Sequence, residues 1–148
     1  PMGRYDDVLD FLARHEDEGE VEMNSRNTPS PEELQEIRTQ YSGVPDDYID
    51  YLAEVGCGAF RECQYAVYSG FIEPSDIFDA ETVGSLGKRV LCFGDNFTGD
   101  PGGFLPDDGW KVVEILHESI EIHDTGKPFG AFIRNQILMD KQGNDMRK

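Results

Sequence analysis

Hydrophobic residues recur at helical spacing in the first third of the chain, and this pattern predicts helices there. The first predicted helix covers about residues 5–16 and leads into a polar, acidic segment, residues 16–28, that is expected to form a loop. The apolar positions of this helix are Tyr5, Val8, Leu9 and Leu12, with Phe11 adjacent. Such a stripe is expected to pack against the rest of the domain.

A second helix follows a clear start signal. Ser30 can cap the helix, Pro31 suits its first position, and Glu33 completes a capping box three residues after the cap. The apolar residues on one face of this helix are Leu34, Ile37 and Tyr41. Gly43 is expected to end it.

A third helix is predicted between Pro45 and Gly56. Asp46 and Asp47 lie near its N-terminus, where the helix dipole favours carboxylates. The expected buried stripe consists of Tyr48, Ile49, Leu52 and Val55. Gly56 can adopt the left-handed conformation that commonly stops a helix.

After Gly56 the apolar pattern becomes typical of strands. The segments expected to form strands are residues 64–72, 89–93, 111–116 and 119–123. Residues 64–72 contain a central glycine, which favours either a hairpin or a bulged strand. His117 and Glu118 are expected to form the turn between the last two strands.

The remaining segments complete the predicted order of elements. Residues 74–78 predict one helical turn, residues 84–87 a loop, and residues 129–137 a final amphipathic helix, with a polar tail after about Asp140. Helices come first, then a run of strands, then a helix. This order favours a single α+β domain with an antiparallel sheet, a helical N-terminal third and a C-terminal helix.

The balance of charged residues indicates which kinds of partner this chain can bind. The chain has 30 acidic and 13 basic residues, for a net charge of −17, and residues 1–54 alone carry −11. Such a field repels nucleic acid and anionic membranes, whose phosphates require Lys and Arg. It would attract a basic protein partner, although an excess of Asp and Glu can also serve solubility alone.

Other features of the sequence narrow the class of protein. Three cysteines without a CxxC pair argue against a disulfide framework and a thiolate zinc site. No signal peptide and no membrane-spanning stretch are visible, so a cytoplasmic location is expected. The three histidines are scattered, and no nucleophile elbow, P-loop or dinucleotide fingerprint is present. We therefore expect no enzyme, no cofactor and no metal.

The most unusual segment is residues 93–104, in which two Gly-Asp pairs flank a short turn between two expected strands. Glycine and aspartate favour a tight turn that satisfies its own hydrogen bonds. Alternatively, the turn is a shallow binding site that presents oxygen atoms to a ligand, but it lacks the ligand spacing of a calcium loop. The candidate residues of this turn are Gly94, Asp95, Asn96, Gly99 and Asp100.

Two further groups are candidates for contact with a partner. Asp46, Asp47 and Asp50 lie on the third predicted helix and either face a basic partner or form an ordinary solvated face. Trp110, the only tryptophan, is expected to be half-buried at one end of the sheet. An exposed part of it would suit an interface, because tryptophan is enriched at binding hot spots.

Two segments can be compared with a known family. Residues 44–52 read VPDDYIDYL and are followed by GCG at 56–58, and residues 93–100 read FGDNFTGD. The first resembles the Leu-Pro-x-x-Tyr-x-x-Phe-Leu … Asn-Gly-Gly helix of the SUKH superfamily, and the second resembles its Gly-Asp strand-turn signature. The order of the motifs also matches, and the likeness spans about residues 30–138. The chain departs from the pattern at Val44, where Leu is usual, and at Cys57, where Asn or Gly is usual.

The resemblance implies a sheet covered by helices mainly on one face, and a function in binding. The SUKH superfamily includes fungal cell-wall-assembly regulators and bacterial immunity proteins that bind and neutralise polymorphic toxins, often nucleases. An acidic inhibitor of a basic nuclease mimics the charge of nucleic acid. The leading hypothesis is therefore a non-catalytic protein-binding module of this kind. The alternatives are a small-molecule-binding domain or hydrolase that uses Asp95 and Asp100, and an intracellular regulatory scaffold.

Overall fold

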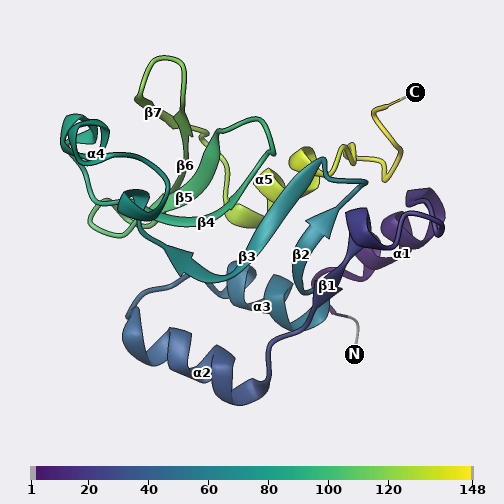
Figure 1. Ribbon diagram of the computed structural model, residues 1–148. Coiled ribbons are helices and arrows are strands. Elements are labelled where there is room, and N and C mark those ends of the chain that lie inside the picture. The colour runs from purple at the N-terminus through teal and green to yellow at the C-terminus, as the bar shows by residue number, and fades with distance from the viewer. Residues whose placement is uncertain (1–2, 148) are drawn as a thin grey trace.

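The computed structural model describes residues 3–147, which form one α+β domain (Figure 1). The helices are α1 (Asp6–His15), α2 (Pro31–Gln40), α3 (Asp46–Glu54), α4 (Ala80–Leu86) and α5 (Phe129–Gln136). The strands are β1 (Arg26–Asn27), β2 (Cys57–Phe60), β3 (Tyr65–Ile72), β4 (Leu91–Asp95), β5 (Pro101–Leu105), β6 (Lys111–Leu116) and β7 (Glu121–Asp124). Two short 3₁₀ turns are η1 (Glu22–Asn24) and η2 (Pro74–Asp76).

The strands form one antiparallel sheet in which spatial order follows sequence order, from β1 at one edge to β7 at the other. Each strand pairs with the next along the chain, as expected when short turns connect antiparallel strands. The predicted α+β class and antiparallel sheet are confirmed.

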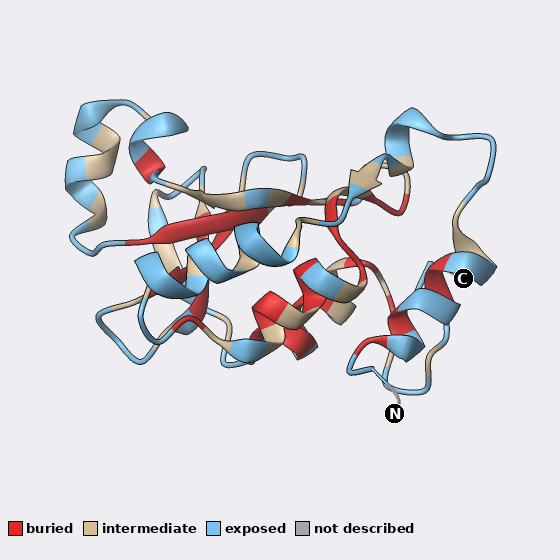
Figure 2. Ribbon diagram, turned by 90° about the horizontal axis from the view of Figure 1, so that it is seen from below, coloured by how far each residue is buried: buried red, intermediate tan, exposed pale blue. Residues whose placement is uncertain are grey.

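Helices cover mainly one face of this sheet. The main core packs residues of α1, α3 and α5 against strands β3, β4 and β5, and Figure 2 shows buried residues gathered on α3 and on the central strands. At its centre the Phe93 ring lies 5.0 Å from the rings of both Phe104 and Phe129. A smaller cluster, which includes Val90 and Val113, lies apart from the main core and packs against Leu86 of α4.

The three predicted N-terminal helices are present. Ser30 and Glu33 form the expected capping box on α2. Gly56 follows α3 with a φ of +109°, and its N–H donates to the Tyr51 carbonyl oxygen at 2.9 Å. Leu9 is the exception on α1: Val8, Phe11 and Leu12 form the buried stripe, and Leu9, which projects to one side of it, is 42% exposed.

For residues 64–72, the second of the two alternatives, a bulged strand, is confirmed, because β3 is one strand with a register shift against β4. The other predictions for this region were less accurate. The hairpin is made with β2, a strand that the pattern did not reveal. β2 is short and begins Cys-Gly-Ala, so its apolar alternation is weak. Of the loop expected at residues 84–87, residues 84–86 form the last part of α4, and Gly87 follows the helix. Asp79 caps the start of α4 by accepting a hydrogen bond from the Thr82 N–H. In addition, β4 and β7 each begin two residues later than predicted.

Two buried tyrosines allow a matched test of core hydrogen bonding. The Tyr5 hydroxyl donates to the Asp47 carbonyl oxygen at 2.7 Å, whereas the Tyr48 hydroxyl has no partner among the described residues. We expect Tyr5→Phe to lower the free energy of unfolding by about 1 kcal/mol and Tyr48→Phe to leave it unchanged or raise it. Urea denaturation of the two variants measures this difference. Equal losses would show that the Tyr48 hydroxyl is satisfied in solution.

Candidate functional site

The three aspartates named as candidates for contact with a partner bind other parts of the same chain. The Asp46 carboxylate accepts a hydrogen bond from Arg38 at 2.8 Å, and Asp50 accepts one from Arg4 at 2.9 Å. Asp47 Oδ2 accepts the Gly130 N–H at 3.0 Å, in the first turn of α5. Asp47 therefore connects α3 to α5, where the positive end of the helix dipole favours its charge.

The Gly-Asp turn is held together by its own side chains. Asp95 accepts hydrogen bonds from the Tyr68 hydroxyl at 2.7 Å and from the Phe97 N–H at 2.8 Å. Asn96 Oδ1 accepts the N–H groups of Thr98 and Asp100 at 3.0 and 3.2 Å. These contacts fit the interpretation of this segment as a tight, self-satisfied connection between β4 and β5.

Asp100 joins this turn to the β6–β7 turn. Its Oδ1 accepts the His117 N–H at 3.0 Å and lies 2.6 Å from His117 Nδ1. Partial burial opposes ionisation of Asp100, but the hydrogen bonds from the His117 backbone and ring lower the pKa of the carboxyl overall. Gly99, with a φ of +101°, lies against the His117 ring. Among residues 3–147, His117 makes no hydrogen bond to a hydroxyl or thiol that would complete a nucleophilic site.

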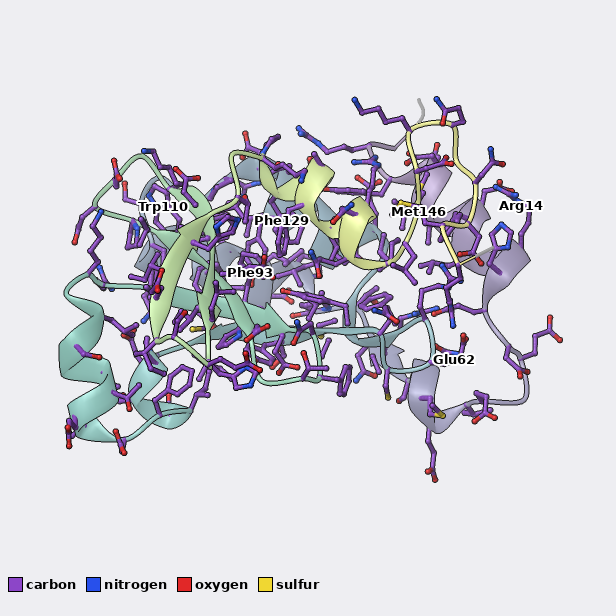
Figure 3. The ribbon with its side chains drawn as sticks, turned by 90° about the horizontal axis from the view of Figure 1, so that it is seen from above. Arg14, Glu62, Phe93, Trp110, Phe129 and Met146 are labelled. Atoms are coloured by element: carbon purple, nitrogen blue, oxygen red, sulfur yellow. The ribbon has the colours of Figure 1, made fainter. Side chains whose placement is uncertain are left out.

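Trp110 is half-buried at one end of the main core, as predicted. Its ring lies 5.5 Å from that of Phe104 and 6.1 Å from that of Phe71. Figure 3 shows it at the opposite end of the molecule from Met146. The Trp110 ring therefore serves largely for packing. The backbone of this residue has a φ of +58°.

The structure reveals a different candidate, a groove between α1 and the segment that follows it. This surface, here called the α1 groove, encloses about 610 Å³. Its apolar residues are Leu9, Leu12, Ala13, Val21 and Val55, and its polar residues are Glu16, Asp17, Glu18, Glu20, Asn24, Ser25 and Arg26. Four of the lining residues are acidic and one is basic.

Apolar side chains of the α1 groove are open to solvent. Val21 is 73% exposed and Leu9 is 42% exposed, while Leu12 and Val55 are buried beneath them. This surface was hard to predict from the sequence, because residues 16–28 look like an ordinary polar loop. The available signal was Val21, an isolated branched residue within an acidic run.

The acidic residues of the groove differ in how they are engaged. Glu16 is paired with Arg26 and also accepts the Arg61 N–H at 2.8 Å, so its charge is largely compensated. Glu18 and Glu20 are exposed and form no ion pair within residues 3–147. Their charges are available to a partner that enters the groove.

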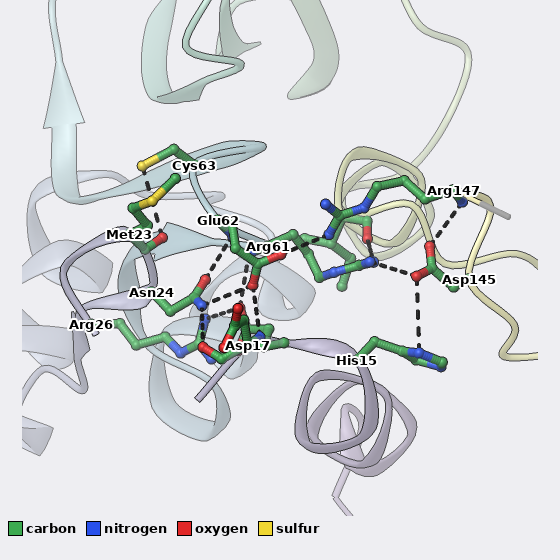
Figure 4. Close-up of polar contacts among 12 residues, drawn as sticks. His15, Asp17, Met23, Asn24, Arg26, Arg61, Glu62, Cys63, Asp145 and Arg147 are labelled. Carbon is green, nitrogen blue, oxygen red and sulfur yellow. Dashed lines mark hydrogen bonds and ion pairs between the residues drawn. The ribbon is translucent and has the colours of Figure 1, made fainter. Parts of the chain in front are cut away.

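A charged cluster behind the groove holds its wall in place (Figure 4). Arg61 is 1% exposed, donates to the Ile137 carbonyl oxygen at 2.6 Å and to Asp145 at 2.7 Å, and lies over the Phe11 ring. Glu62 accepts hydrogen bonds from the Asp17 N–H and from Asn24, at 3.0 and 2.9 Å. The β2–β3 turn therefore ties together α1, the groove segment and the C-terminal residues.

Within residues 3–147, no three His, Cys, Asp or Glu side chains converge as they would around a metal ion. No helix in this range is long and apolar enough to span a bilayer. Cys57, Cys63 and Cys92 are free thiols.

Comparison of the chain with protein-family models, with curated proteins and with solved structures finds no match. The likeness to the SUKH superfamily stays a prediction from the motifs at residues 44–58 and 93–100.

Proposed function

We propose that this chain is a non-catalytic protein-binding module whose α1 groove takes a basic, partly apolar segment of a partner protein. The observation that carries the proposal is the combination of exposed Leu9 and Val21 with unpaired Glu18 and Glu20 in one groove. Apolar contacts supply affinity, and the surrounding carboxylates select a basic segment and speed its encounter.

The net charge of −17 of the whole chain also supports a basic partner. A field of that size attracts a basic protein over a distance of about one Debye length, roughly 10 Å at moderate salt. It also disfavours nucleic acid and anionic membrane as partners.

We further propose that the partner is a toxin neutralised inside the producing cell. This step rests on the resemblance of residues 44–58 and 93–100 to the SUKH superfamily. A cytoplasmic location agrees with three free thiols, because that compartment keeps cysteines reduced. A basic nuclease toxin would present the charge that the groove lacks.

Binding to a neighbouring toxin tests the proposal. The probe is the toxin domain encoded beside the gene for this chain, purified with its active site inactivated, and binding is measured at low and high salt. We expect an affinity that falls as salt rises. If no salt-sensitive association is found, toxin neutralisation should be rejected.

A pair of charge-reversal variants tests the groove itself. Glu18→Lys/Glu20→Lys should weaken binding by about tenfold, equivalent to ~1.4 kcal/mol. The matched control is Glu32→Lys/Glu36→Lys on the exposed face of α2, which changes the net charge by the same amount. Equal weakening by both variants would attribute binding to the overall field and contradict a role for the groove.

A further inference from the structure

A second pocket, lined by basic and apolar residues, lies where α5 meets the C-terminal segment. We call it the α5 pocket. It encloses about 330 Å³ and is lined by Lys127, Ala131, Arg134, Asn135, Met139 and Met146, with Asp140 and Lys141 at its rim. Figure 3 shows Met146 beside the end of α5. This volume lies at the lower end of the range for small-molecule sites.

The lining of this pocket is basic, with Lys127, Arg134 and Lys141 against one carboxylate, Asp140, although the chain as a whole is acidic. Residues 127–148 contain five basic and two acidic residues, a net charge of +3, whereas residues 1–126 carry −20. Three basic residues lining one pocket of such an acidic protein are not explained by general solubility, which the acidic residues already supply.

Two of the basic residues are free to bind a ligand. Arg134 is held by Asp7, with N–O distances of 2.9 and 3.0 Å. Lys127 and Lys141 are exposed and form no ion pair within residues 3–147. Asp140 accepts the N–H groups of Gln142 and Asn144, so its carboxylate stabilises the turn beside the pocket.

The other walls of the pocket are apolar. Met139 is buried and Met146 is 42% exposed, and both line the pocket together with Ala131, an exposed residue of α5. Methionine side chains are flexible and polarisable, so they adapt to alkyl groups of different shape. An alkyl chain placed here would remove Met146 from water.

We propose that the α5 pocket binds a small carboxylate that carries an apolar tail. The tail would lie against Met139 and Met146, and the carboxylate would pair with Lys127 and Lys141. When Asp7 and Asp140 are counted with the three basic residues, the site has a net charge of +1, which a monoanion neutralises. Lysine binds such a group as a point charge and requires no bidentate geometry.

Decanoate is a suitable probe, with decanol and decyltrimethylammonium as uncharged and cationic controls. Binding to the full chain is followed by amide chemical shifts. We expect decanoate to shift residues of α5 and residues 139–147, with weaker binding of decanol and no binding of the cation in this pocket. Equal binding of decanol, preferential binding of the cation, or no decanoate binding would each overturn the proposal.

Matched lysine variants test the role of charge. Lys127→Gln/Lys141→Gln should weaken decanoate binding by about tenfold, because both exposed ion pairs with the carboxylate are lost. Lys88→Gln/Arg89→Gln removes the same charge before β4, away from the pocket, and should leave the affinity unchanged. Equal effects of the two variants would contradict the site. The proposal is independent of toxin binding, because neither variant alters the α1 groove.

Discussion

Replacement of Arg61 by methionine should lower the free energy of unfolding by about 3 kcal/mol, as is typical when one partner of a buried ion pair is removed. The guanidinium is almost inaccessible and donates to both the Ile137 carbonyl oxygen and Asp145. Partial burial opposes ionisation of Asp145, but hydrogen bonds from Arg147 and Arg61 lower its pKa overall. The variant therefore leaves the Asp145 carboxylate without the positive charge and hydrogen bond of Arg61.

The Arg61 prediction is checked by urea denaturation, with Arg38→Met as the matched control. Arg38 makes an exposed ion pair with Asp46, so its replacement should leave the free energy of unfolding nearly unchanged. Arg61→Lys keeps the positive charge, and its free energy of unfolding should lie between those of the two methionine variants. The ammonium group of lysine cannot reproduce the planar set of donors of the guanidinium. Similar midpoints for Arg61→Met and Arg38→Met would show that the buried pair adds nothing to stability.

Replacement of Gly94 by alanine should also be strongly destabilising, by about 3 kcal/mol, which is at the upper end for overpacking. A Cβ atom at Gly94 would lie 2.2 Å from the Ala66 carbonyl oxygen and 2.9 Å from the Tyr65 ring. Since the oxygen belongs to the backbone of β3, strands β3 and β4 would have to move apart. The effect arises from packing, since Gly94 is buried.

Gly70→Ala is the control for this prediction. Gly70 lies in β3, where a Cβ atom would meet no heavy atom within 4 Å. This variant should keep the stability of the original chain, and thermal unfolding of the two variants checks the contrast. A Gly94→Ala protein as stable as Gly70→Ala would show that β3 and β4 separate at little cost.

The candidate residues named from sequence act mostly within the fold. The pattern of Gly, Asp and Asn at residues 94–100 indicated a turn, because these residues favour left-handed and self-bonded backbone. Its side-chain partners, Tyr68 and His117, come from other strands, so they could not be read from the local sequence. Likewise, the role of Asp47 at the start of α5 joins residues 83 positions apart.

The sequence by itself determined the class of fold and the positions of α1, α2, α3 and α5, but it did not reveal α4. Helical periodicity and local start signals such as Ser30 and Glu33 depend on residues close together in the sequence. They can therefore be recognised without knowledge of the tertiary contacts. The net charge, and with it the kind of partner to expect, is likewise a property of composition.

Only the tertiary structure decided which surfaces are available for binding. The α1 groove exists because Leu9 lies beside the buried stripe and the acidic segment folds back toward it. The burial of Arg61 depends on Phe11, Ile137 and Asp145, which are distant in sequence. Both features arise from contacts between residues far apart in the sequence. The local sequence pattern around a residue does not predict such contacts.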